Sequence, residues 1–185
     1  MELFFDTETT GLPNKKTPDS DPSQPDIVQL GIILADRNRI YSENSLIIKP
    51  DWMFNIHPRA EEVHGISLEV ISLTGVSTHL ALDLFEAMLV HADTVVCHNY
   101  TFDLKLMSIA MAKDNRDSLP LKRKKAYCTM RSSTDICKLP GNYGKYKWPK
   151  LQELHKHLFG VEFDGAHDAL EDVRATRRCY YKMKG

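Results

Sequence analysis

Three segments that favour β-strands follow one another at the start of this chain, and they constrain its fold more than any other feature. The first is the apolar run Leu3–Thr7, and the second is Ile27–Ala35, which is rich in β-branched residues. The third, Ile40–Ile48, follows after a turn at Asp36-Arg37-Asn38. Consecutive strands with short connections are typical of an antiparallel meander. Residues 13–26 contain four prolines and few apolar residues, which predicts a mobile loop.

The rest of the chain has mainly helical spacing. Apolar residues recur every three or four positions, as at Leu80, Leu84 and Met88. Helices are expected over residues 58–63, 67–73, 80–90, 101–113, 151–159 and 168–183, and two further short strands over 94–97 and 126–128. No linker divides the chain. We therefore predict a single α/β domain over residues 1–185, with a mixed five-stranded sheet, an antiparallel meander of its first three strands and flanking helices.

Charge and composition restrict the possible functions. The net charge is −1, so any surface for nucleic acid must be local. Two basic tracts, residues 122–125 and 145–150, are candidates, although a solvated surface is the commoner role for each. No apolar run is long enough to span a membrane, and the N-terminus does not resemble a signal peptide. Four scattered cysteines are typical of a cytoplasmic protein with reduced thiols.

Two carboxylates follow the apolar part of the first strand. Asp6 and Glu8 are two positions apart, so a strand directs both to one face of the sheet. Two adjacent carboxylates repel each other, and a divalent cation with a preference for oxygen ligands, such as Mg²⁺ or Mn²⁺, removes that penalty. Taken alone, an acidic pair at a strand end is more often an ordinary solvated surface.

Two later stretches carry further acidic groups at helix starts. Asp103 falls in the first turn of the helix that follows the strand 94–97, where its charge suits the helix dipole. His167 precedes the last helix, with acidic residues at positions 168, 171 and 172. Each of these three acidic residues is a possible ligand by position, and Asp168 is also a suitable helix cap.

Together these stretches resemble the DEDD exonuclease superfamily in its His-containing, DnaQ-like branch (DEDDh), the family of the DNA polymerase III epsilon proofreading subunit. The motif Asp-x-Glu matches Asp6 and Glu8, Asn-x-x-x-Asp matches Asn99 and Asp103, and His-x-x-x-x-Asp matches His167 and Asp172. The motifs occur in family order and span most of the chain. The resemblance implies a ribonuclease H-like fold and a metal-dependent 3′→5′ exonuclease, and it selects Asp172 over Asp168 and Glu171.

The resemblance also implies the roles of these residues. Two divalent ions, Mg²⁺ or Mn²⁺, would be held by Asp6, which is shared, by Glu8 and Asp172, and by Asp103. His167 would act as general base on the attacking water, and its reference pKa of about 6.5 suits that role near neutral pH. The expected substrate contacts are Thr9, Thr10, Gly11, Leu12 as a wedge between bases, His64, Ile66, Asn99 and Phe102. Ordinary core packing is the alternative for Leu12, Ile66 and Phe102.

The expected substrate is the single-stranded or frayed 3′ end of DNA, cut to nucleoside 5′-monophosphates in proofreading or DNA repair, with a polymerase as a possible partner. The motifs do not separate DNA from RNA, because that choice depends on contacts near the 2′-position. An RNA 3′-exonuclease of the same superfamily is therefore an alternative, and a non-catalytic nucleic-acid-binding module is a weaker one.

Overall fold

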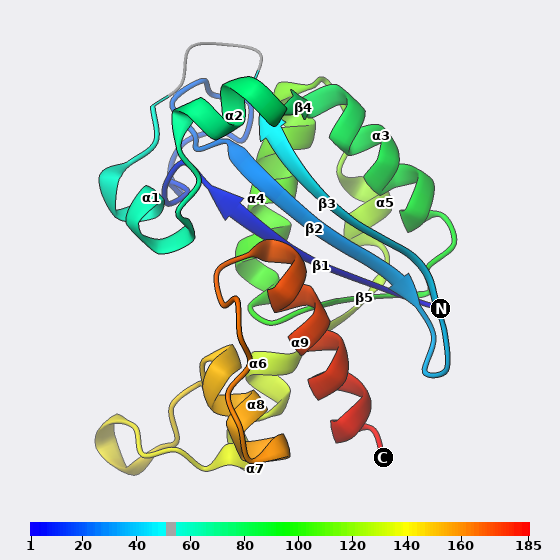
Figure 1. Ribbon diagram of the computed structural model, residues 1–185, viewed down its shortest axis with the longest axis vertical. Helices are drawn as coiled ribbons and strands as arrows, with labels where there is room; N and C mark the ends of the chain where they lie inside the picture. The colour runs from blue at the N-terminus through cyan, green and yellow to red at the C-terminus, as the bar shows by residue number, and fades with distance from the viewer. Residues whose placement is uncertain (51–54) are drawn as a thin grey trace.

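The computed structural model describes residues 1–50 and 55–185 (Figure 1). Three long strands come first, as the sequence predicts: β1 (Glu2–Thr9), β2 (Ile27–Ala35) and β3 (Ile40–Lys49). The later strands are β4 (Val76–Ser77), β5 (Thr94–Cys97) and β6 (Lys125–Cys128). The helices are α1 (Pro58–His64), α2 (Leu68–Thr74), α3 (Thr78–Leu89), α4 (Tyr100–Lys113), α5 (Leu119–Lys122), α6 (Thr129–Ser132), α7 (Thr134–Cys137), α8 (Leu151–Phe159) and α9 (Ala169–Met183), with one 3-10 turn, η1 (Asn142–Gly144).

The six strands of the described residues join one sheet in the order β4-β3-β2-β1-β5-β6. Strand β2 is antiparallel to β1 and β3, whereas β5 is parallel to β1 and β6 is parallel to β5. The predicted mixed sheet with an antiparallel meander is thus confirmed. The sheet has one strand more than the predicted five, because the two-residue β4 pairs in parallel with the end of β3. A strand of two residues is too short to show an alternating pattern in a sequence.

Helices cover both faces of the sheet. Alternate side chains of β1 point to opposite faces. Phe5 packs edge-on against Phe85 of α3, within the core that α3 and α4 form on one face. Phe4 packs edge-on against Tyr180 of α9 on the other face. In Figure 1 the red α9 lies in front of the sheet, and α3 and α4 lie behind it. The alternation therefore directs Asp6 toward the side of the sheet that carries α9.

The predicted helices are all present, with ends shifted by a few residues. Ser67 caps α2, as expected, by accepting a hydrogen bond from the N–H of Val70. The four-residue helices α5, α6 and α7 were not predicted, since one helical turn carries no readable periodicity. Among the described residues, no helix is long and apolar enough to cross a membrane.

Residues 13–26 form the predicted loop, with no helix or strand. The Gln24 side chain closes this loop by donating to the carbonyl oxygens of Asn14 and Thr17 at 2.8 Å. Lys105 of α4 forms an ion pair with Asp19, which attaches the loop to that helix. The mobility of the loop stays a prediction.

Candidate active site

The end of β1 carries the two carboxylates that the sequence singled out. Asp6 lies opposite Gly31 of β2, and Glu8 lies opposite Gln29. Both side chains are half-buried, although Leu3, Phe4 and Phe5, earlier in the same strand, are fully buried apolar groups. Strand β1 thus passes from buried apolar residues to acidic residues near its C-terminal end.

Asp103 reaches the same place from the other side of β1. It lies in the first turn of α4, as predicted, and only 3% of its surface is exposed. The hydroxyl of Thr7 donates to Asp103 Oδ1 at 2.9 Å. Because Thr7 lies between Asp6 and Glu8 in β1, this hydrogen bond joins the start of α4 to the acidic end of the strand.

The start of α9 completes the cluster. Ligand atoms of Glu8, His167 and Asp172 all lie within 4.8 Å of one another. Asp172 Oδ1 is buried and has no hydrogen-bond partner among the described residues. His167 has a φ of +70°, which a non-glycine residue adopts at a cost of about 1–3 kcal/mol. The backbone is therefore held in an unfavourable conformation at the residue expected to act as the base.

Burial and mutual repulsion raise the pKa values of all four carboxyl groups. Burial raises the pKa of Asp6 well above its usual value, and the charges of Asp103, Asp172 and Glu8 add to this effect. For Glu8, burial followed by the charges of Asp172 and Asp103 raises the pKa to about 8. Burial likewise raises the pKa of Asp103 and of Asp172, opposed by hydrogen bonds from Thr7 and from the backbone of His167 respectively. The ionised cluster therefore needs positive charge.

No lysine or arginine of the described residues supplies that charge. None of the ion pairs within residues 1–50 and 55–185 includes Asp6, Glu8, Asp103 or Asp172. A set of clustered carboxylate oxygens, one of them buried without a partner, fits hard divalent cations such as Mg²⁺ or Mn²⁺. The donor set therefore fits the metal site expected from the sequence.

Two residues of β2 bring α9 to this cluster, and the sequence reasoning missed both. The Gln29 side chain donates to Asp168 Oδ2 at 2.9 Å and accepts from the N–H of Ala169 at 3.1 Å. A Cβ atom at Gly31 would lie 2.4 Å from the carbonyl oxygen of Ala169, so only glycine allows this close approach. A polar residue and a glycine inside an otherwise apolar strand were the available signals.

Asp168 acts as the helix cap that the sequence suggested. Its Oδ1 accepts from the N–H groups of Leu170 and Glu171, at 3.0 and 3.2 Å. Glu171 forms an ion pair with Arg174 on the same helix. Both acidic residues therefore have structural partners, whereas Asp172 Oδ1 has no hydrogen-bond partner within residues 1–50 and 55–185.

A cavity of about 660 Å³ opens beside Glu8. It is lined by Thr7, Glu8, Thr9, Gly11, Leu12, His57, Arg59, Ala60, Val63, His64 and Phe102. Five of the predicted substrate residues are in this set: Thr9, Gly11, Leu12, His64 and Phe102. Leu12 is 84% exposed, so it is not the core residue that the alternative supposed. His64 is held in place by the carbonyl oxygen of Thr9, 3.3 Å from its Nε2.

The other three predicted substrate residues lie elsewhere. Thr10 is buried, and its hydroxyl accepts from the N–H of Asp26. Ile66 is 8% exposed and packs in a core cluster with Val28 and Ile71, which agrees with the core alternative. Asn99 is exposed at the start of α4 and does not line the cavity. Their roles in binding stay predictions.

A histidine and an arginine that line the cavity were not predicted from the sequence. His57 and Arg59, at the start of α1, line the cavity together with Glu8. Nothing in a proline-containing segment before a short helix pointed to a binding role.

Comparison with known proteins assigns the chain to a family. A family profile described as an exonuclease, RNase_T, matches residues 3–180. The chain belongs to this exonuclease family. The family is part of the DEDD superfamily that the three motifs indicated, so the expected exonuclease class of enzyme and its ribonuclease H-like fold are confirmed.

Individual relatives agree with the family assignment. An uncharacterised exonuclease, CP81, of Escherichia phage 186 is 29% identical over 180 residues, which cover 94% of this chain and 83% of that protein. The zinc-bound complex of E. coli exonuclease I with single-stranded DNA has a TM-score of 0.77 at 19% identity. That alignment covers 99% of this chain but only 40% of exonuclease I. The nuclease domain of 3′hExo, a DEDDh family member bound to rAMP, has a TM-score of 0.72 at 15% identity, covering 99% of this chain and 90% of that domain.

Proposed function

We propose that this chain is a 3′→5′ exonuclease that hydrolyses the terminal phosphodiester of single-stranded DNA and releases nucleoside 5′-monophosphates. The observation that carries the proposal is the cluster of four acidic side chains, which form no ion pair with a lysine or arginine of the described residues, next to a cavity of nucleotide size. A family of exonucleases supplies the reaction class. The substrate and the residue roles are our inference.

Asp6, Glu8, Asp103 and Asp172 would hold two divalent cations, with Asp6 shared between them. When bound, such ions lower the pKa of a coordinated water and stabilise the leaving oxygen. The hydrogen bond from Thr7 positions Asp103 for this role, and Asp172 has one carboxylate oxygen without a hydrogen-bond partner in the described part of the chain.

His167 would accept the proton of the attacking water. Its imidazole lies within 4.8 Å of ligand atoms of Glu8 and Asp172, and the residue is exposed to solvent. A base in this position is close to the water that the acidic cluster would bind, and it can pass the proton to solvent.

The cavity would hold the 3′-terminal nucleotide. Backbone groups of Thr9 and Gly11 lie beside Glu8, which suits contacts with the terminal 3′-hydroxyl. The exposed Leu12 would separate the last two bases, and Phe102 would pack beside the terminal one. Arg59, on the cavity wall, adds a positive charge for a phosphate.

RNA is the second candidate substrate. The 3′hExo domain, which resembles almost the whole chain, is bound to the ribonucleotide rAMP, whereas the exonuclease I complex holds single-stranded DNA. The proofreading or repair role, the polymerase partner and the cytoplasmic location stay predictions.

Parallel digestion tests the proposal. Single-stranded DNA and RNA of the same sequence, labelled at the 5′ end, are incubated with Mg²⁺, with Mn²⁺ and with a chelator. We expect a ladder shortened from the 3′ end, faster for DNA and absent with the chelator. A faster reaction on RNA would reverse the substrate assignment. Cleavage that persists in the chelator would reject the metal-dependent mechanism.

A further inference from the structure

One basic, aromatic segment of the chain has no place in the proposed function. Residues 138–150 contain four lysines, two tyrosines and one tryptophan, and no acidic residue. The segment folds back on itself as a hairpin: Pro140 bridges to Tyr146 in antiparallel fashion, and the N–H of Lys147 donates to Leu139 O at 3.0 Å. We call residues 138–150 the aromatic hairpin. In Figure 1 it is the yellow segment that extends from the body of the molecule.

The aromatic rings of the hairpin are exposed to solvent. Tyr143 at its tip is 99% exposed, Trp148 is 59% exposed and Tyr146 is 47% exposed. Tyr143 also has a φ of +56°, a conformation that glycine adopts more easily than tyrosine. The tip therefore presents a large ring to water from a strained backbone, which the packing of this chain does not explain.

The base of the hairpin is attached to the elements that form the active site. His98, at the end of β5, lies 3.0 Å from the carbonyl oxygen of the buried Pro149. Arg131 stacks over the Trp148 ring, 5.5 Å from its centroid, and donates to the Thr101 hydroxyl of α4 at 3.1 Å. The next residue of α4 is Phe102, which lines the cavity. One continuous set of contacts thus leads from the cavity to Trp148.

The charges of the hairpin suit a polyanion. Lys147 is paired with Glu153 at 2.5 Å, whereas no ion pair of the described residues includes Lys145 or Lys150. Lysines that alternate with exposed aromatic rings match a single strand, because phosphates meet the charges and bases stack on the rings. A surface that binds a folded protein does not need lysines to alternate with aromatic rings, so this pattern favours a single strand as the partner.

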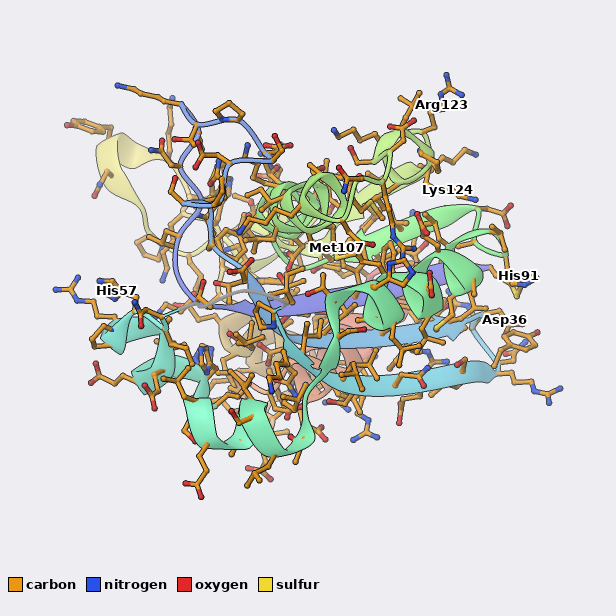
Figure 2. All side chains as sticks on the ribbon, turned by 90° about the horizontal axis from the view of Figure 1, so that it is seen from above. Asp36, His57, His91, Met107, Arg123 and Lys124 are labelled. Carbon is orange, nitrogen blue, oxygen red and sulfur yellow. The ribbon has the colours of Figure 1, made fainter. Side chains whose placement is uncertain are left out.

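The other basic tract, residues 122–125, lies at the end of the sheet away from the acidic cluster. Lys125 pairs with Thr94, and Thr94 pairs with Glu2, so the tract adjoins the start of β1 rather than its acidic end. Figure 2 shows Arg123 and Lys124 on the opposite side of the molecule from His57, which lines the cavity. The two tracts, equivalent in the sequence, therefore differ in their relation to the active site.

We propose that the aromatic hairpin is a second nucleic-acid contact site, which binds the part of the single strand upstream of the nucleotides in the cavity. Bases stack on the exposed faces of Trp148, Tyr146 and Tyr143, and the phosphates between them contact Lys145 and Lys150. Arg131, on one face of Trp148, fixes that ring and leaves its other side for a base. This inference rests on the proposed function, because it assumes that the 3′ end lies in the cavity.

Length-dependent binding tests the hairpin. Fluorescence anisotropy with 5′-labelled oligothymidylates of about 4 and about 16 nucleotides compares a strand too short to leave the cavity region with one long enough to reach the hairpin. A chelator prevents cleavage. Trp148→Ala and Tyr143→Gly should each weaken binding of the long strand by about five-fold or more. Affinity for the short strand, and its turnover with Mg²⁺, should stay unchanged.

Matched variants separate this site from general effects. Tyr41→Ala removes a tyrosine of β3 that is 49% exposed, and Lys122→Ala changes the other basic tract. Both should bind the long strand as the wild type does. Trp148→Phe should retain most of the affinity, because phenylalanine also stacks. Tyr143→Gly relieves the left-handed backbone, so its thermal stability should be kept or raised, and lost affinity cannot then be attributed to unfolding.

The outcomes distinguish the two proposals. Equal binding of the long strand by the wild type and both hairpin variants would overturn the hairpin site and leave the exonuclease intact. Equal losses for short and long strands would also overturn it, since the hairpin would then act only through the structure of the cavity. Hairpin-dependent binding of the long strand without metal-dependent cleavage would refute the exonuclease proposal and retain the binding site.

Discussion

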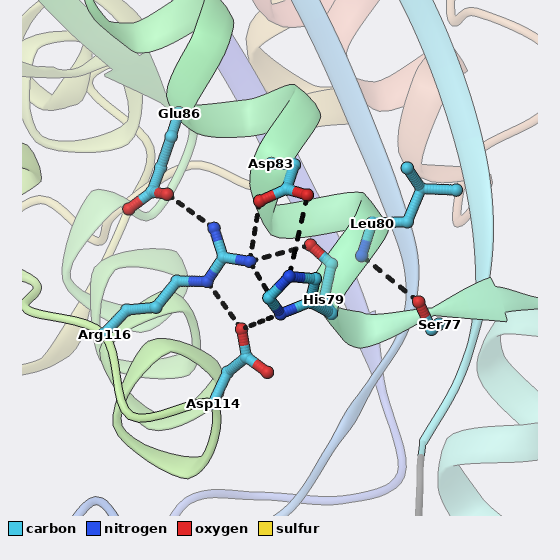
Figure 3. A network of polar contacts seen from close by, with 7 residues as sticks. All are labelled: Ser77, His79, Leu80, Asp83, Glu86, Asp114 and Arg116. Carbon is cyan, nitrogen blue, oxygen red and sulfur yellow. Dashed lines mark hydrogen bonds and ion pairs between the residues drawn. The ribbon is translucent and has the colours of Figure 1, made fainter.

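Two acidic clusters of this chain have similar ingredients and opposite electrostatics. At the end of β1, no ion pair of the described residues joins a lysine or arginine to Asp6, Glu8, Asp103 or Asp172. Between α3 and the end of α4, the acidic residues Asp83, Glu86 and Asp114 surround Arg116, which contacts them at 2.8, 2.6 and 2.5 Å (Figure 3). A histidine accompanies each cluster, His167 in the first and His79 in the second.

The difference shows what each cluster is suited for. Arg116 donates hydrogen bonds to three carboxylates, which raise its pKa despite its partial burial, so the guanidinium stays charged and joins two helices. In the cluster at β1, burial and then mutual repulsion instead raise the pKa values of the carboxyl groups. A carboxylate cluster with a built-in cation is complete, whereas the cluster at β1 is suited to binding an external cation, as we propose.

The largest expected effect is loss of activity in Asp6→Asn. This substitution removes the carboxylate with the most acidic neighbours, so metal-dependent cleavage should be abolished. The folded protein without metal should become more stable near neutral pH, because the substitution removes a carboxyl group whose ionisation is opposed by burial and by its acidic neighbours. A labelled-oligonucleotide assay and a thermal melt measure the two effects. Asp83→Asn is the control, since it alters the cluster that contains Arg116 and should leave cleavage unchanged. Retained activity in Asp6→Asn would reject the metal site.

The second effect concerns the base. His167→Ala should lower turnover by roughly 10²-fold or more, because it removes the proton acceptor. Binding of a nucleoside monophosphate should largely survive, since the carboxylates remain. Stopped-time assays give the turnover, and titration calorimetry gives the binding. His79→Ala, which changes the histidine of the other cluster, should cleave normally. Near-normal turnover in His167→Ala would reject His167 as the general base.

A third prediction concerns stability. Arg116→Met leaves three carboxylates facing one another, so we expect a loss of about 1–2 kcal/mol in the free energy of unfolding, discounted for the exposure of Asp83 and Glu86. Urea denaturation measures this loss. Cleavage per folded molecule should not change, because the proposed reaction uses no residue of the Arg116 cluster. An unaltered midpoint would mean that the cluster does not stabilise the fold.

The fourth prediction concerns pH. The Glu8 pKa is raised from its usual 4.5 to about 8, so the native state holds more protons than the unfolded chain across that interval. Stability in a chelator should therefore fall as the pH rises from about 5 to 8. Added Mg²⁺ should reverse the fall, most strongly at pH 8. The slope should be smaller in Asp6→Asn. Stability that is constant with pH, or that rises, would contradict the pKa shift.

The smallest effect is expected at Leu12. In Leu12→Ala the exposed wedge is gone, so the preference for unpaired over paired 3′ ends should fall by a few-fold, about 1 kcal/mol. Competition between a blunt duplex and a frayed one gives this ratio. An unchanged ratio would assign the wedge to another residue.

The sequence predicted the sheet, the main helices and the acidic set, because these leave local signals. Alternation and helical spacing identified the elements, and three short motifs identified the family. Gln29 and Gly31 were missed, since their function is to accept α9, a partner about 140 positions away in the chain. The burial of Ile66 and the different surroundings of the two basic tracts likewise depend on contacts between distant segments.

Anomalous diffraction from a crystal grown with Mn²⁺ and a nucleoside 5′-monophosphate tests the central claim most directly. Our account predicts two manganese peaks roughly 3.5–4 Å apart, with the Asp6 carboxylate between them and none beside Arg116. Asp172 Oδ1, which has no hydrogen-bond partner among the described residues, should then coordinate a manganese ion. An Asp6 cluster free of manganese in such a crystal would contradict the account.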